Sequence, residues 1–149
     1  MTLHGWELLK LVIAYALALP IAWERERDER SAGLRTYPLV AIASCAYVTI
    51  GLVFLHSEAA APRIIQGLLS GVGVVAAGAI IQDRFRVHGT ATAASILGTG
   101  AIGTAVAFGA YDIAIALSLM SYLTLRLLKP LKRRVEEDPS RETERPRAH

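Results

Sequence analysis

The stretch Ala91–Leu128, ATAASILGTGAIGTAVAFGAYDIAIALSLMSYLTLRLL, decides how many times the chain crosses a membrane, because it carries only two charged residues. A helix needs about 20 apolar residues to cross the hydrocarbon core of a bilayer, so a stretch of roughly 40 residues is too long for one span. Gly109 and Asp112 lie near its middle and are typical turn residues. We therefore expect two spans, Ala91–Gly109 and Tyr111–Leu128, joined by a tight hairpin.

Three further apolar runs precede this pair: Trp6–Trp23, Pro38–Leu55 and Ile64–Ile81. The chain has 149 residues, of which 53% are hydrophobic and 19% are charged, and most charges lie between or after the runs. This segregation is typical of a membrane protein whose loops carry the charge. We expect an all-α membrane protein: a bundle of five transmembrane helices over residues 1–130 and a disordered charged cytoplasmic tail over residues 131–149.

The basic residues of the loops predict the orientation of the bundle, because cytoplasmic loops carry an excess of positive charge. With five spans, the first loop, the third loop and the tail share one face. The opposite face carries Arg63, with Lys10 close to it. We therefore expect the N-terminus outside and the C-terminus in the cytoplasm, whereas four spans would divide the basic segments between both faces. The basic residues of the shared face are Arg25, Arg27, Arg30, Arg35, Arg84, Arg86, Lys129, Lys132, Arg133 and Arg134.

Small residues in the third and fourth runs predict how the helices pack, because helices in lipid associate through close backbone contact. The third run contains a G-x-x-x-G pair, and the fourth carries a small residue at every fourth position. We expect these two helices to meet at the centre of the bundle. A close approach of the backbone to a ligand is the alternative reading of the glycines. The expected packing residues are Gly67, Gly71, Gly73, Gly78, Ser95, Thr99 and Gly103.

Several classes of protein are excluded by what the sequence lacks. It shows no nucleophile elbow, Walker loop, zinc-ligand spacing or dinucleotide fingerprint, and its single cysteine is Cys45. The basic residues flank apolar runs, which indicates an anionic lipid surface rather than nucleic acid as the partner. We therefore expect no enzymatic activity, no metal, no cofactor and no nucleic-acid partner. Only His4 precedes the first run as a basic group, so we interpret that run as a retained span rather than a signal peptide.

The charged block after Trp23, ERERDER, has two interpretations. On a helix that continues past Trp23, Arg25 can pair with Glu29, and Glu26 can pair with Arg30, which would make the block a solvated, self-paired helix end. Alternatively, a turn at the following glycine brings the next loop residues back toward the carboxylates, and the block then forms part of a site.

Three motifs, in this order and spacing, resemble the MgtC/SapB family of bacterial inner-membrane proteins. They are ERE at residues 24–26 followed by AGLRT at 32–36, RIIQGLLSGVGVVAAGAI at 63–80, and VHGTATAASI at 87–96 with AIG at 101–103. The chain departs from the family pattern at four points. Val74 and Ala76 stand where the family usually has phenylalanine and glycine, Thr90-Ala91 replaces Leu-Thr, and the acidic residue often found before Arg63 is absent.

The resemblance implies a multi-pass protein of the bacterial inner membrane that supports magnesium or ion homeostasis, or stress adaptation, through other membrane proteins. A subunit of a small cation transporter or channel, lined by Gln66 and the glycines, is the alternative, and a homo-oligomer would favour it. Glu24, Arg35 and Arg86 are expected to cluster at the cytoplasmic face. The candidate functional residues are Glu24, Glu26, Arg35, Thr36, Arg63, Gln66, Arg86 and Thr92.

Overall fold

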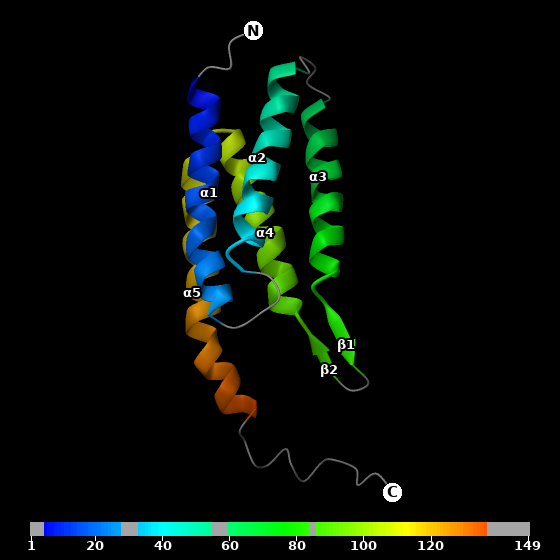
Figure 1. The fold of residues 1–149 in the computed structure, drawn as a ribbon, viewed down its shortest axis with the longest axis vertical. Helices are drawn as coiled ribbons and strands as arrows, with labels where there is room; N and C mark the ends of the chain where they lie inside the picture. The colour runs from blue at the N-terminus through cyan, green and yellow to red at the C-terminus, as the bar shows by residue number, and fades with distance from the viewer. Residues whose placement is uncertain (1–4, 28–32, 55–59, 84–85, 137–149) are drawn as a thin grey trace, which may run out of the picture.

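The computed structural model describes residues 5–27, 33–54, 60–83 and 86–136, which form an up-and-down bundle of helices (Figure 1). The five predicted segments are helical, and four of the helices are long and apolar enough to cross a membrane. The apolar part of the third helix, Ala61–Ala77, is shorter. The helices are α1 (Gly5–Glu26), α2 (Thr36–Phe54), α3 (Ala60–Ala77), α4 (Thr90–Ala107) and α5 (Tyr111–Glu136).

The tight hairpin between the last two helices is confirmed. Gly109 has φ 77°. This left-handed conformation is common for a glycine just after the last residue of a helix. The Gly109 N–H donates to the Val106 carbonyl at 3.0 Å, and the Ala110 N–H donates to the Ala105 carbonyl at 2.9 Å. Asp112 lies in the first turn of α5 rather than in the turn itself.

Helix α5 extends past the residue at which the sequence predicted the tail to begin. It ends at Glu136, so residues 131–136 are helical instead of disordered. Residues 137–149, the rest of the predicted tail, lie outside the described part of the chain.

A short antiparallel hairpin, β1 (Ile81–Asp83) and β2 (Arg86–His88), was not predicted. The apolar run suggested a helix as far as Ile81, but α3 ends at Ala77, and Gly78 and Ala79 form a turn. Gly89 closes the base of the hairpin with φ 89°, and a Cβ there would collide with the Ala79 carbonyl. A glycine is therefore required directly before α4 begins.

Helix α4 is the centre of the bundle, because it contacts each of the other four helices. Its small residues Ser95, Thr99, Gly103 and Ala107 are buried, as the four-residue spacing predicted. Their closest neighbour is α2: a Cβ on Gly103 would collide with the Ala41 carbonyl.

The predicted contact between α3 and α4 is present, but the glycines of α3 do not make it. Helix α3 packs against α2 and α4, but Gly67, Gly71 and Gly73 have nothing within 4 Å of the position that a Cβ would take. The helix instead turns aliphatic side chains inward, and Val72 is the side chain that lies against Gly100 of α4. Gly78 lies in the turn after α3.

We predict opposite effects of alanine at two of these glycines. Gly103→Ala should destabilise the bundle by about 1–3 kcal/mol, the usual cost of overpacking a tight contact. Gly73→Ala, the control, should be neutral or stabilising by up to about 1 kcal/mol, because alanine is the better helix former. Thermal unfolding in detergent, followed by the fluorescence of Trp6 and Trp23, measures both. Equal melting temperatures for the two variants would contradict the α2–α4 contact.

Candidate functional site

A group of buried polar side chains lies at the end of the bundle where α1 ends and α4 begins (Figure 1). Glu24 and Arg25 of α1 are 7% and 5% exposed, which is unusual for charged residues. Tyr37 of α2 and Thr92 and Ser95 of α4 are buried at the same end. We call these five residues the polar cluster.

Two hydrogen bonds tie the helices of the polar cluster together. The Arg25 guanidinium donates through Nη2 to the Thr92 hydroxyl, which joins α1 to α4. The Tyr37 hydroxyl lies 2.7 Å from the Ser95 Oγ, which joins α2 to α4. Arg25 Nε is buried without a hydrogen-bond partner among the described residues. Because Arg25 lies in the last turn of α1, the carbonyl end of that helix also stabilises its charge.

Glu26, next to the polar cluster, fixes the start of α2. Its Oε2 accepts a hydrogen bond from the Leu34 backbone N–H at 3.0 Å. The carboxylate occupies the space that a Cβ on Gly33 would need, so a larger residue there would have to displace the Glu26 side chain. The Gly33 carbonyl in turn accepts from the Thr36 N–H at 3.0 Å, which begins α2. The carboxylate therefore orders the loop through backbone contacts.

The structure brings together only some of the residues that the sequence singled out. Glu24 and Thr92 belong to the polar cluster, whereas Arg35 is exposed and Thr36 is half-buried at the first position of α2. The Arg86 side chain and residues Glu29 and Arg30 lie outside the described part of the chain, so the expected cluster of Glu24, Arg35 and Arg86 stays a prediction, as do the pairs Arg25–Glu29 and Glu26–Arg30. Among the described residues, the buried arginine is Arg25 and not Arg35.

Arg63 lies in the first turn of α3 and Gln66 in the second. The start of α3 and the end of α1 are at opposite ends of the bundle (Figure 1), so these residues are distant from the polar cluster. Both side chains are exposed. They therefore cannot act in the same local site as Glu24 and Thr92.

The sequence contained a signal for Arg25 that was missed. The buried residues of α1 are spaced as one helical stripe, and Arg25 continues that stripe by one further turn. Extending the apolar periodicity into the charged block would have placed Arg25 inward and Arg27 outward. The buried residues of the stripe are Ala14, Ala18, Ile21, Ala22 and Arg25.

The other end of the bundle is joined by a lysine. Lys10 Nζ lies 3.2 Å from Glu7 Oε2, an i, i+3 pair on α1, and it donates to the Ala107 carbonyl at 3.2 Å. The ammonium group thus satisfies a carbonyl at the end of α4, as cationic side chains do at helix C-termini. Ser118 of α5 donates to the Leu17 carbonyl at 2.7 Å and holds α5 on α1.

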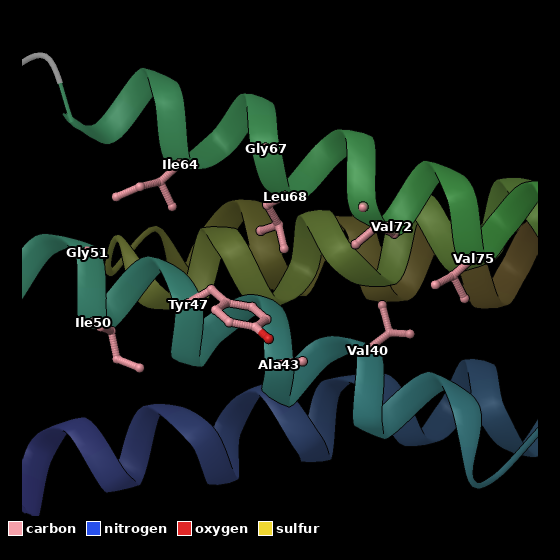
Figure 2. A pocket seen from close by; sticks show the side chains of 11 residues that line it. Val40, Ala43, Tyr47, Ile50, Gly51, Ile64, Gly67, Leu68, Val72 and Val75 are labelled. Carbon is pink, nitrogen blue, oxygen red and sulfur yellow. The ribbon is translucent and has the colours of Figure 1, made fainter.

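An apolar groove with a volume of about 540 Å³ lies between α2 and α3 (Figure 2). Aliphatic side chains and Tyr47 form its walls, and the backbone of Gly67 and Gly71 is part of its surface on α3. The groove holds no charged residue, so its lining suits an apolar occupant rather than an ion.

The sequence model of the MgtC family matches residues 11–134, which cover α2, α3 and α4 entirely and most of α1 and α5. The chain belongs to the MgtC family. The polar cluster contains residues of the first and third motifs described above, and α3 carries the second.

Members of the MgtC family with curated sequences are about 30% identical to this chain. The uncharacterized protein slr0014 of Synechocystis sp. is 33% identical over 137 residues, which cover 92% of this chain and 58% of that protein. The putative magnesium transporter YhiD of Escherichia coli K12 is 30% identical over 131 residues, covering 83% of this chain and 61% of that protein. Protein MgtC of Salmonella typhimurium is 30% identical over 132 residues, covering 89% and 56%.

The chain thus spans somewhat more than half the length of these MgtC-family relatives. No solved structure matches it.

We predict that Arg25 and Thr92 stabilise the fold as a pair. Arg25→Gln and Thr92→Val should show a coupling energy of about 1.5–3 kcal/mol in a double-mutant cycle, the range for hydrogen bonds to charged groups. Unfolding in detergent gives the four free energies that the cycle needs. Arg27→Gln combined with Thr92→Val is the control and should be additive, because Arg27 is exposed. Additivity in both cycles would show that the Arg25–Thr92 bond contributes nothing.

Proposed function

We propose that this chain is a non-enzymatic regulatory protein of the bacterial inner membrane that supports magnesium homeostasis by binding other membrane proteins. Membership in the MgtC family and the names of two relatives, Protein MgtC and the putative magnesium transporter YhiD, support the link to magnesium. The chain spans only part of those relatives, so the activity of the whole relative enters here as part of the proposal.

The position of the side-chain hydroxyl groups of α4 favours a regulator over a channel. Thr99 donates to the Ser95 carbonyl at 2.8 Å, and Thr104 donates to the Gly100 carbonyl at 2.9 Å, both within α4. An ion path needs oxygen atoms that face a shared pore, whereas the Thr99 hydroxyl is fully buried among the packed helices and does not line the groove between α2 and α3. The groove between α2 and α3 is apolar, and the described residues contain no group of three or more side chains of His, Cys, Asp or Glu.

We also propose five membrane crossings, with the N-terminus outside and the C-terminus in the cytoplasm. Helices α1, α2, α4 and α5 have the length and hydropathy of spans, and α3 runs beside α2 and α4 over a similar height (Figure 1). The polar cluster and the end of α5 then share the cytoplasmic side, where the arginine-rich loops are concentrated. On this orientation Arg63 lies at the outer surface.

A partner would most readily approach the turn at residues 33–35, just before α2. Glu26 and Gly33 hold this turn through the hydrogen bond to Leu34, and Arg35 is presented on it with an exposed side chain. Because the backbone next to Arg35 is held, less conformational entropy is lost when its exposed guanidinium binds an acidic group than on an unrestrained segment. Arg27 is the matched control, because it is an exposed arginine at the end of α1 that does not lie on this turn.

Growth across a magnesium series tests the proposed function. Deletion of the gene should slow growth at low magnesium, and the wild-type chain should restore it. Arg35→Ala should restore less growth than Arg27→Ala at equal expression, because only Arg35 lies on the ordered turn. In liposomes, the purified chain should pass no more magnesium than empty vesicles. Unchanged growth and membrane potential at every magnesium level would refute the regulator, and a protein-dependent flux would favour a transporter subunit.

Reporter fusions test the proposed orientation. A reporter after His149 should be active in its cytoplasmic form only, and one inserted between α2 and α3, at residues 55–59, should be active in its periplasmic form only. The two fusions together distinguish five crossings from four, because the α2–α3 loop and the C-terminus lie on opposite sides of the membrane only if α3 crosses. A periplasmic signal after His149 would overturn the orientation.

A further inference from the structure

Helix α3 turns polar side chains away from the bundle. Arg63, Gln66 and Ser70 are exposed, and their spacing of three and seven residues puts them on one face of the helix. Leu68 and Val72 of the same helix pack toward the core. If α3 crosses the membrane, as proposed above, then Gln66 and Ser70 face hydrocarbon, which offers them no hydrogen-bond partner.

The backbone of α3 is open beside these polar side chains. A Cβ on Gly67 or Gly71 would have nothing within 4 Å, and both glycines border the groove of about 540 Å³ that α2 walls on the other side (Figure 2). Val74, one turn after Ser70, is 74% exposed, more than any other large hydrophobic side chain of the described residues. This surface thus combines a protruding side chain, an open backbone and a hollow, the features of a helix–helix contact in lipid.

We propose that this face of α3 is a homodimer interface, at which α3 of a second copy of this chain docks. The proposal rests on the membrane crossing of α3 proposed above. An acyl chain could fill the apolar groove, but it would leave Gln66 and Ser70 without hydrogen-bond partners. A second α3 brings the same amide and hydroxyl, and each of these groups both donates and accepts hydrogen bonds.

The exposed face of α3 that carries Gln66 and Ser70 is therefore complementary to itself. A two-fold interface requires this, because the same surface of both copies forms the contact. Around the two-fold axis, Gln66 and Ser70 lie at the same depth in both copies and can bond across the contact. Val74 of one copy faces the glycine-bordered hollow of the other. Arg63 lies near the outer end of α3, from which its long side chain can reach the headgroups and avoid its counterpart.

Disulfide cross-linking in native membranes tests the interface. In a Cys45→Ala background, which removes the single cysteine, Ser70→Cys should form a covalent dimer on mild oxidation. Leu119→Cys, exposed on α5 and 55% accessible, is the control and should stay monomeric. Equal cross-linking at both positions would mean random collision and would overturn the proposal.

A second measurement uses the uncross-linked protein. Gln66→Leu should lower the dimer association constant in detergent by about tenfold, as loss of a hot-spot contact of 1.4 kcal/mol does, whereas Thr124→Leu on the exposed side of α5 should not. Light scattering gives the association constants, and the melting temperature shows whether each variant folds. A wild-type monomer that retains lipid in native mass spectrometry would assign the groove to lipid and overturn the proposal.

A Ser70→Cys adduct with a different protein, without a homodimer, would overturn the proposal as well. These outcomes are independent of the magnesium phenotype, so the interface and the proposed function can fail separately. The reporters at residues 55–59 and after His149 together show whether α3 crosses the membrane.

Discussion

The close contact of α2 with α4 is the constraint on which the rest of the bundle depends. Hydrocarbon gives helices no hydrophobic reason to associate, so backbone proximity and hydrogen bonds must hold them. Gly103 supplies the proximity by leaving room for the Ala41 carbonyl, and the Tyr37–Ser95 hydrogen bond, 2.7 Å long, supplies the polar link at one end. Because α4 contacts every other helix, its position on α2 also sets where α1, α3 and α5 can pack.

A buried arginine is tolerated in this bundle because of where it lies. Arg25 is one residue from the end of α1, where free carbonyl groups favour a positive charge, and the Thr92 hydroxyl accepts one of its hydrogen bonds. The next residue, Glu26, faces the loop and accepts from the Leu34 N–H. Arg25 thus contacts α4, and the adjacent Glu26 contacts the backbone just before α2. The charged block therefore contributes both to helix packing and to the start of α2.

The sequence predicted the helices well, because hydropathy, charge segregation and the Gly109 turn are local signals. The sequence did not predict the features that depend on which residue of another helix a given residue contacts. Gly67 and Gly71 were assigned to an internal contact because a G-x-x-x-G pair indicates close packing but does not say with which helix. The hairpin at residues 81–88 was missed because Ile81 continues an apolar run. Arg25 could have been found from the stripe of α1, whereas the Glu26–Leu34 bond depends on how the chain turns at Gly33.

Four glycines of α3 and α4 form two pairs with different consequences for the molecule. Gly103 lies against α2 and Gly100 lies against Val72 of α3, so both belong to contacts that the single chain completes by itself. Gly67 and Gly71 touch nothing within 4 Å of a Cβ position, so internal packing gives no reason for glycine there. Glycine inside a helix costs about 0.5–1 kcal/mol relative to alanine. A helix that bears this cost twice on its outer face, next to an exposed glutamine, is shaped for a contact that lies outside the bundle.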